Sequence, residues 1–247
     1  MLNNDFHHPG LLAQRLATLD RLSGGRLEVG IGAGHAFPEY EAASIAFDPP
    51  ALRKRRLTES VEVLRRLLDR ERIDHHGEHY DLTDLATIEP AQEHVPILVG
   101  VNGRSALAAA ARSADTIGLT MLGKTLPDGN RHAVRWEPER LDATVTWIAE
   151  QAGIRAGYLE LNALVQAVVV TDDRRRAAEE LSAEVPGLDV DHALSTPFLA
   201  LGTHDEIATH LLACRKRWGI SYYVVRDIDS FAPVIESLRH DDLRGTG

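Results

Sequence analysis

Hydrophobic positions along the chain recur at helical spacing in some segments and form short unbroken runs in others. Helical spacing predicts one helix that starts at Pro9 and a second that follows Pro49 and Pro50, because the fixed φ of proline suits a first helical turn. Apolar runs with almost no polar alternation predict strands that are covered on both faces, at residues 27–32, 96–100 and 116–120. Strand and helix therefore alternate from the beginning of the chain.

The second half of the chain continues this alternation. Thr203 and Glu206 form a capping-box pattern, which predicts a helix that starts there and ends at Gly219. Glycine and proline within residues 121–136 predict a long irregular loop. The remaining predicted elements are a hairpin over residues 75–81, a helix from Pro138, a strand over 162–170, a helix capped by Asp172 or Asp173, a strand over 221–225 and a helix over 231–238.

Alternating strands and helices predict an α/β fold with parallel strands and right-handed crossovers, which means a barrel or a doubly wound sheet. About five strands are convincing in the sequence, whereas a closed (β/α)8 barrel needs eight. No internal repeat, low-complexity tract or linker interrupts the pattern. Residues 1–247 are therefore predicted to form a single domain.

Composition narrows the classes of partner. The 247 residues carry a formal net charge of −10, which disfavours a nucleic-acid partner. No apolar run approaches the roughly 18 residues that a membrane span needs, and the first residues lack the pattern of a secretory signal. We therefore expect a cytoplasmic protein without a membrane partner. The one cysteine, Cys214, follows an apolar stripe, which indicates a buried structural thiol.

A glycine-rich segment, residues 30–34, follows the first buried run. It fails the dinucleotide pattern G-x-G-x-x-G because the last position is His35, and Pro38 makes the following residues a poor helix start. Glycines at the carboxyl end of a strand allow a flat ring to approach the backbone closely. A tight turn without a ligand is the alternative interpretation.

A second loop, residues 100–105, joins the next strand to a helix. Unpaired amides at that helix terminus favour an anion, and Arg104 adds charge and planar donors. An ordinary surface turn is the alternative. The histidine cluster at residues 75–79 lacks a helical H-E-x-x-H pattern and contains Gly77, which suits a hairpin turn. No metal site is predicted.

Six motifs occur in the order seen in the luciferase-like monooxygenases, and the chain resembles that family, in its actinobacterial branch that depends on the deazaflavin coenzyme F-420. The motifs are Leu-Ser-Gly-Gly-Arg at 22–26, Gly-x-Gly-x-Gly at 30–34 followed by Glu39, a helix with Arg53, Arg56 and Glu59, Gly-Glu-His-Tyr at 77–80, Pro-Ile-Leu-Val-Gly at 96–100 and Ala-Asp at 114–115. Residues 202–225 resemble the last unit of the family. The resemblance implies a TIM (β/α)8 barrel of luciferase-like type.

The resemblance also implies an oxidoreductase that uses reduced coenzyme F-420 to transfer a hydride to or from a small organic substrate, with FMN as the alternative cofactor of a monooxygenase. It implies His35 as a catalytic acid or base, since an unperturbed pKa of about 6.5 needs little shift. Val101 stands where the family usually has a second glycine. The cofactor-binding residues implied are Gly32, Ala33, Gly34, Glu39, Gly100, Asn102, Gly103 and Arg104, with Arg226 added because it follows the last strand at the rim.

The family places three strands before the segment that matches residues 4–9, and none of them precedes Met1 in this sequence. At roughly 30 residues per barrel unit, the difference is on the order of 60 to 70 residues. We therefore expect an N-terminally truncated, open barrel with about strands 4–8, produced by a late start codon or by a real truncation. Such a chain exposes strand edges and apolar interior, so a binding or subunit-interaction module without catalysis is the alternative function. The family resemblance also makes a homodimer the assembly to test.

Overall fold

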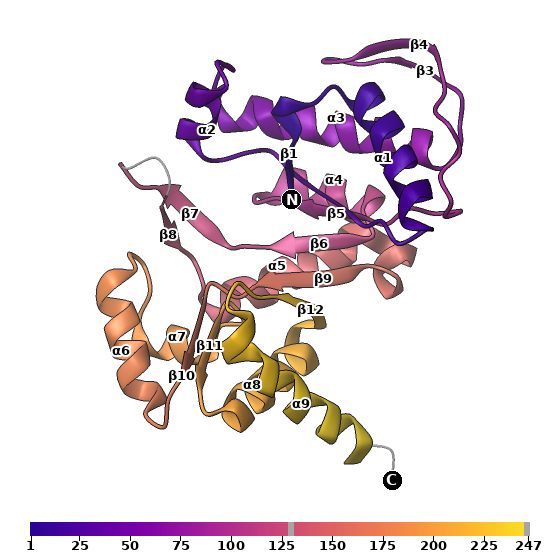
Figure 1. Ribbon diagram of the computed structural model, residues 1–247. Coiled ribbons are helices and arrows are strands. Elements are labelled where there is room, and N and C mark those ends of the chain that lie inside the picture. Colours follow the sequence, from indigo (N-terminus) through magenta and orange to yellow (C-terminus); the bar gives the residue numbers. More distant parts are fainter. Residues whose placement is uncertain (128–130, 245–247) are drawn as a thin grey trace. The chain divides into compact units, whose positions relative to one another are not determined.

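The computed structural model describes residues 1–127 and 131–244, and its chain divides into two compact units. The first unit comprises Met1–Gly118 and Ile148–Leu159, and the second comprises Leu119–Trp147 and Glu160–Gly247. Figure 1 labels the elements of both. The helix α5 (Pro138–Ala152) begins in the second unit and ends in the first.

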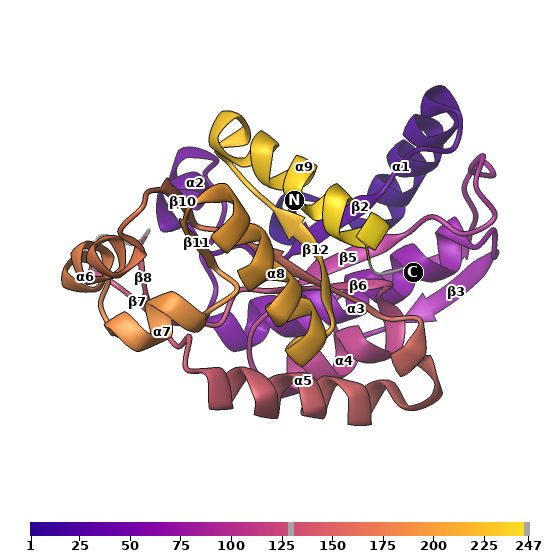
Figure 2. The ribbon, with the colours of Figure 1, turned by 90° about the horizontal axis from the view of Figure 1, so that it is seen from below.

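Parallel strands organise the first unit. Their order is β1 (Leu2–Asn3), β2 (Val29–Gly32), β5 (Ile97–Gly100) and β6 (Thr116–Leu119), which lie side by side in Figures 1 and 2. The register pairs Asn3 with Gly32, Gly32 with Gly100 and Gly100 with Gly118. The carboxyl ends of these strands therefore meet at one edge of the sheet. The three apolar runs of the first half are confirmed as buried parallel strands.

Helices of the first unit match the predicted stripes. The helix α1 (Pro9–Ser23) starts at the predicted proline and ends before Gly24, whose φ of 69° lies in the left-handed region. The helix α3 (Pro50–Leu68) buries Leu57, Val61, Leu64 and Leu68, and each contributes roughly 1.5–3 kcal/mol of hydrophobic free energy. The other elements are the short helices η1 (Asn4–Phe6) and η2 (Gly153–Gly157), the helix α4 (Arg104–Ser113), and the predicted hairpin of β3 (Ile73–His76) and β4 (Asp81–Leu85).

The second unit contains two parallel strand pairs. The strand β9 (Glu160–Leu164) pairs with β12 (Ile220–Val224), and β10 (Ala167–Val170) pairs with β11 (Leu199–Gly202). A core cluster joins the strands to the helices α8 (His204–Trp218) and α9 (Ile228–Arg244), and its members are Val165, Ala200, Ile207, Ala208, Leu211, Phe231 and Val234. The capping box of Thr203 and Glu206 is present as predicted. The helix α6 (Arg174–Glu184), capped by Asp173, and the helix α7 (Val190–Ser195) complete the unit.

Three sequence predictions are wrong. Residues 162–170 form two strands, because the chain changes partner at Val165, whose amide donates to Val224, and at Gln166, whose amide donates to Phe198. Residues 121–136 contain an antiparallel pair, β7 (Leu122–Thr125) and β8 (His132–Val134), although residues 128–130 of that segment lie outside the described part.

The third error concerns Pro38. A short helix, α2 (Phe37–Ala42), begins one residue before it, because the first amides of a helix have no intrahelical acceptor and proline therefore loses no bond there. The strand β11 and the helix α7 were not predicted at all. The predicted α/β class with mostly parallel strands is confirmed. Among the described residues, no helix combines the length and the apolarity that crossing a membrane requires.

Candidate functional site

The two glycine loops begin at neighbouring positions of one sheet edge. Gly32 at the end of β2 is the register partner of Gly100 at the end of β5, and both strands run in the same direction. Within the loops that follow, Gly34 has a φ of 71° and Gly103 a φ of 94°, which are conformations that other residues adopt with strain. The carboxyl edge of a parallel sheet is where α/β proteins place their ligands.

Glycines also leave one face of these strands without side chains. Gly30 and Gly32 alternate on β2 and share a face, and Gly100 lies beside Gly32. The side chain of Met1 lies over this glycine patch (Gly30, Gly32 and Gly100), since a Cβ on Gly32 would be 3.0 Å from its Sδ and a Cβ on Gly100 would be 2.7 Å from its Cε. The patch is a flat surface of backbone atoms against which an aromatic ring can stack.

Tyr40, which is fully buried, contacts the first loop through its hydroxyl group. Its Oη lies 3.0 Å from Asp5 Oδ2, 3.1 Å from Asn3 Oδ1 and 3.2 Å from the Ala33 carbonyl. Burial, followed by the interaction with Asp5, raises the pKa of the Tyr40 hydroxyl, so it keeps its proton and donates. A Cβ on Gly34 would lie 2.1 Å from the same oxygen, which leaves room only for glycine.

Arg53 of α3 holds the same loop from a second direction. Its side chain is buried, and its Nη1 donates to the carbonyls of Ala33 and Gly34 while its Nε donates to the Asp48 carbonyl at 2.9 Å. The guanidinium Cζ lies 4.1 Å from the centre of the Phe47 ring. The sequence analysis took this arginine only as part of a family motif. The structure shows it as a direct support of the loop.

Lys54, the next residue on α3, reaches the second loop. Its Nζ lies 3.4 Å from the place that a Cβ on Gly103 would take. Gly103 is the N-cap of α4 and has no side chain that could cap the helix. Burial, followed by the charge of Arg53, lowers the pKa of Lys54. The sequence analysis did not name Lys54 as a site residue. Helices of α/β units start near the carboxyl ends of the strands, where ligands bind, and Lys54 lies near the start of α3.

The other predicted site residues surround these loops. His35 and Glu39 are exposed, Glu39 in the first turn of α2, and Arg104 is exposed at the start of α4. Ala33 and Asn102 are half-buried. Arg226 is exposed directly after β12 in the second unit. The first unit thus brings together every predicted site residue except Arg226.

The histidine cluster has a structural role. Glu59 of α3 accepts hydrogen bonds from the amides of His79 and Tyr80, each at 2.9 Å, and its Oε1 lies 3.0 Å from His75 Nε2. Burial favours the neutral carboxyl, but the bonds from His75, Tyr80 and His79 outweigh it and lower the pKa of Glu59. This carboxylate therefore anchors the turn of the hairpin. The described residues hold no group of three or more side chains suited to a metal ion.

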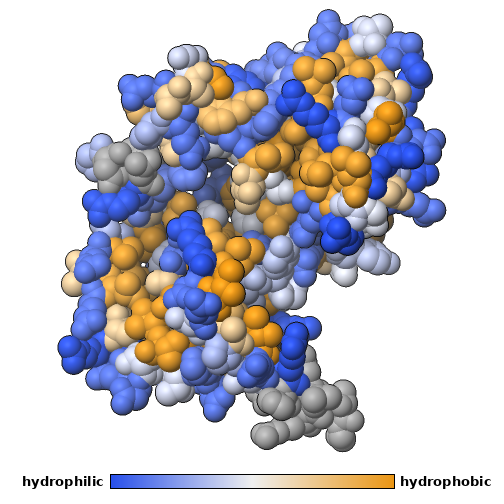
Figure 3. All heavy atoms as spheres, viewed as in Figure 1, coloured by the Kyte–Doolittle hydropathy of each residue, from blue (hydrophilic) through white to orange (hydrophobic). Residues whose placement is uncertain are grey.

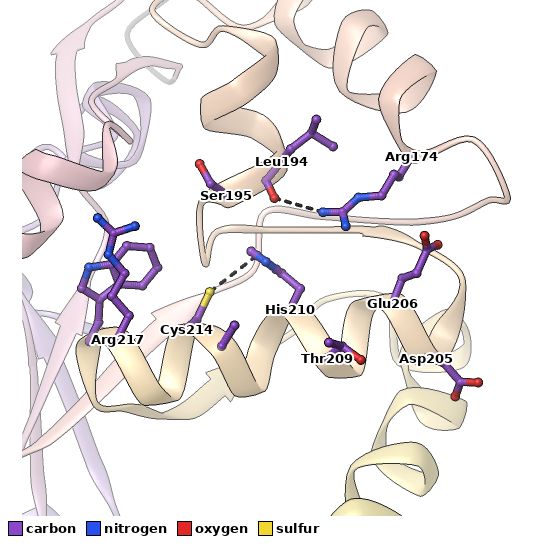
Figure 4. Close-up of a pocket in the computed structure, with 11 residues that line it drawn as sticks. Arg174, Leu194, Ser195, Asp205, Glu206, Thr209, His210, Cys214 and Arg217 are labelled. Atoms are coloured by element: carbon purple, nitrogen blue, oxygen red, sulfur yellow. Dashed lines mark hydrogen bonds between the residues drawn. The ribbon is translucent and has the colours of Figure 1, made fainter.

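A separate cavity of about 500 Å³ lies within the second unit, between α8 and the helices α6 and α7. Figure 4 shows Cys214 and His210 of α8 pointing toward each other, with Sγ 3.5 Å from Nε2. Sequence reasoning found no histidine partner for this thiol, and the structure supplies one. Burial nevertheless raises the pKa of Cys214 to about 12, so the thiol stays protonated and is a poor nucleophile.

The chain is similar to several known proteins. A family model described as luciferase-like monooxygenase matches residues 1–207. An F420-dependent glucose-6-phosphate dehydrogenase of Nakamurella multipartita is 34% identical over 184 residues, which are 70% of this chain and 48% of that protein. The chain therefore spans about half the length of the curated relative that it matches.

Solved structures show the same fold. A monooxygenase of Streptomyces bottropensis is 25% identical with a TM-score of 0.66, and the match covers 96% of this chain and 72% of that one. A coenzyme F420 dependent tetrahydromethanopterin reductase of Methanopyrus kandleri is 18% identical, also with a TM-score of 0.66, over 96% of this chain and 79% of that one. The chain thus shares its fold with both of these proteins.

Proposed function

Because the chain belongs to the luciferase-like monooxygenase family, we propose that it is an oxidoreductase that uses reduced coenzyme F-420 to transfer a hydride to or from a small organic substrate. The observation that carries this proposal is the glycine patch of Gly30, Gly32 and Gly100 between two loops at one sheet edge. An F420-dependent relative covers most of the chain, which favours the deazaflavin over FMN.

The residues of the first loop suit the ring of such a cofactor. The glycine patch provides a flat backbone surface, and Gly34 allows the next residues to approach it without a side chain between them. When bound, the deazaflavin supplies the hydride chemistry, and the protein supplies position and electrostatics. Ala33 precedes Gly34 in the loop, and Glu39 lies in the first turn of α2. The side chain of Met1 has to move aside for a ring to lie there, which its exposure permits.

The second loop suits the phosphate of the cofactor. The amides at the start of α4 point out of the helix toward Gly103, and a helix amino terminus favours an anion. Lys54 adds a positive charge beside Gly103 from another element, and Arg104 and Asn102 belong to the loop itself. The amino terminus of α4 and the Lys54 cation therefore lie beside the same glycine, which an isolated surface turn does not require.

We assign proton transfer to His35. It follows Gly34 directly and is exposed, so its imidazole can reach a substrate that lies on the ring. Imidazole exchanges protons near neutral pH with little environmental tuning, as transfer to a substrate oxygen requires. Arg226 belongs to the second unit, where it is exposed after β12, and its role as a cofactor contact stays a prediction from the sequence.

We further propose that the chain provides about strands 4–8 of a (β/α)8 barrel and that this part stays open. Hydrophobic side chains are visible on the face shown in Figure 3, and both units expose large ones. Exposed apolar residues are expected where a barrel interior lacks its cover. The exposed ones include Leu11, Leu19 and Leu22 on α1 and Val170, Ile228 and Ile235 in the second unit.

The test is a titration of the purified chain with coenzyme F-420 and, separately, with FMN, followed by absorbance and by the shift of the thermal unfolding midpoint. We expect saturable binding of coenzyme F-420, with weaker binding of FMN. Stronger binding of FMN would assign the chain to flavin monooxygenation. If neither cofactor binds, the chain is a noncatalytic relative that acts through protein contacts, and the proposed activity is wrong.

A further inference from the structure

We propose that Arg53 is a positioning residue of the cofactor site, which sets the orientation of the first loop and through it the place of His35. This inference rests on the proposed function, but its first measurement needs no cofactor. It starts from the surroundings of the guanidinium. Arg53 is 5% exposed, and within the described part of the chain its group is paired with three backbone carbonyls and no carboxylate.

A buried cation without a carboxylate partner has a large desolvation cost, so its position calls for a compensating role. The adjacent acids are taken by Arg56, whose guanidinium lies 2.9 Å from Asp5 and 2.5 Å from Asp48. Arg53 contacts backbone oxygen atoms and two rings, that of Phe47 at 4.1 Å and that of Tyr40 at 5.8 Å from Cζ to the ring centre. Its hydrogen bonds therefore constrain the backbone conformation of the residues whose carbonyls it binds.

The held carbonyls determine where the opposite ends of the same peptides point. A trans peptide places its N–H opposite to its C=O, and the described residues contain no cis peptide bond. Because Arg53 binds the carbonyls of Ala33 and Gly34, the amides of Gly34 and His35 are directed away from α3. The left-handed φ of Gly34 is fixed by the same contacts, and the His35 side chain leaves the backbone at the next position.

Lysine cannot replace these contacts. The guanidinium is planar, presents five donors in a fixed fork and stacks on an aromatic ring, whereas an ammonium is a compact, strongly hydrated point charge. Arg55 provides a matched control on the same helix, because it is about half exposed and pairs with Glu78 on the surface. Arg53→Lys and Arg55→Lys therefore make the same chemical change at a buried and at an exposed position.

The first measurement is the backbone order parameter of Gly34 and His35 by NMR in the protein without cofactor. We expect values near about 0.85 in the wild type and in Arg55→Lys, and below about 0.6 in Arg53→Lys. The second is the dissociation constant of coenzyme F-420, which we expect to rise by about tenfold in Arg53→Lys alone. A rigid loop in Arg53→Lys overturns the inference, and so does a mobile loop that binds with wild-type affinity.

A second variant covers the case in which Arg53→Lys does not fold. Phe47→Leu keeps every hydrogen bond of the guanidinium and removes the ring beneath it, together with the edge contacts of that ring to Phe37 and Tyr40. We expect a smaller fall of both order parameters and a dissociation constant about threefold higher. Wild-type order parameters in this variant overturn the inference. If the wild type binds neither coenzyme F-420 nor FMN, the proposed function is wrong, whereas the order parameters still decide whether Arg53 sets the loop.

Discussion

Lys54 Nζ lies 3.4 Å from the position of a Cβ on Gly103, which brings a cation from α3 to the start of α4. Lys54 belongs to α3 and Gly103 is the N-cap of α4, so the two residues are distant in sequence and only the fold brings them together. The pairing makes this terminus the best-supported anion position of the first unit.

Replacing Lys54 by Met should weaken binding of a phosphorylated cofactor and spare an analogue without the phosphate. FMN and riboflavin differ in that group alone, so their dissociation constants should be compared by fluorescence titration at two ionic strengths. We expect about a tenfold loss for FMN and almost none for riboflavin. Lys216→Met, at an exposed position of α8, is the control. Equal losses for both ligands would remove Lys54 from the phosphate position.

Gly34→Ala should destabilise the fold through two separate effects. The left-handed φ of 71° costs any other residue free energy, and the new methyl group would lie 2.1 Å from Tyr40 Oη. Gly153→Ala isolates the first effect, because its φ is 56° and nothing lies within 4 Å of its Cβ position. We expect a loss of about 1 kcal/mol for Gly153→Ala and of more than about 2 kcal/mol for Gly34→Ala, measured by urea unfolding. Equal losses would show that the loop relaxes around the methyl group.

The Glu59 carboxylate should make stability depend on pH. Its pKa is lowered below the ordinary value of 4.5, so its contribution is complete above that value and is lost as the pH falls through the folded-state pKa. Glu59→Gln should therefore be less stable than the wild type by about 1–3 kcal/mol near about pH 7, and the gap should narrow as the pH falls below 4.5 and through the lowered folded-state pKa. Thermal or urea unfolding across this range measures it. Glu62→Gln, exposed on the same helix, should show no such gap.

Cys214 should resist thiol reagents in the folded protein. Its thiol is buried and its pKa is raised to about 12 by that burial, so almost no thiolate exists near about pH 8. We expect a reaction with a chromogenic disulfide at least about 100-fold slower in the native protein than in concentrated guanidinium chloride. A fast native reaction would mean that the cavity beside His210 opens to solvent.

Local signals predicted much of the fold. Pro9 and Pro50 mark the starts of α1 and α3, and the capping box at Thr203 marks the start of α8, because each acts within one helical turn. The break between β9 and β10 has no such signal. Val165 and Gln166 continue an apolar run without glycine or proline, and only their different partner strands separate them.

Local signals predicted only a part of the candidate site, because the rest depends on contacts between distant segments. The glycine loops are recognisable as segments, whereas the roles of Arg53 and Lys54 depend on which side of α3 faces the strand ends. Helical periodicity distinguishes a buried stripe from a polar face, but it does not tell a solvated arginine from one that binds backbone carbonyls. That distinction needs the position of α3 against β2 and β5, which is set by contacts between distant segments.

Arg53 and Lys54 are consecutive residues of one helix, and they serve the two loops separately. A helix rises about 1.5 Å per residue and is stiff over one turn, so α3 fixes the distance between the proposed ring position and the proposed phosphate position. Deazaflavin and flavin mononucleotides carry ring and phosphate at the two ends of the same kind of sugar-alcohol chain. The proposed site therefore does not distinguish the two cofactors by their length, and discrimination between them falls to the residues around the ring.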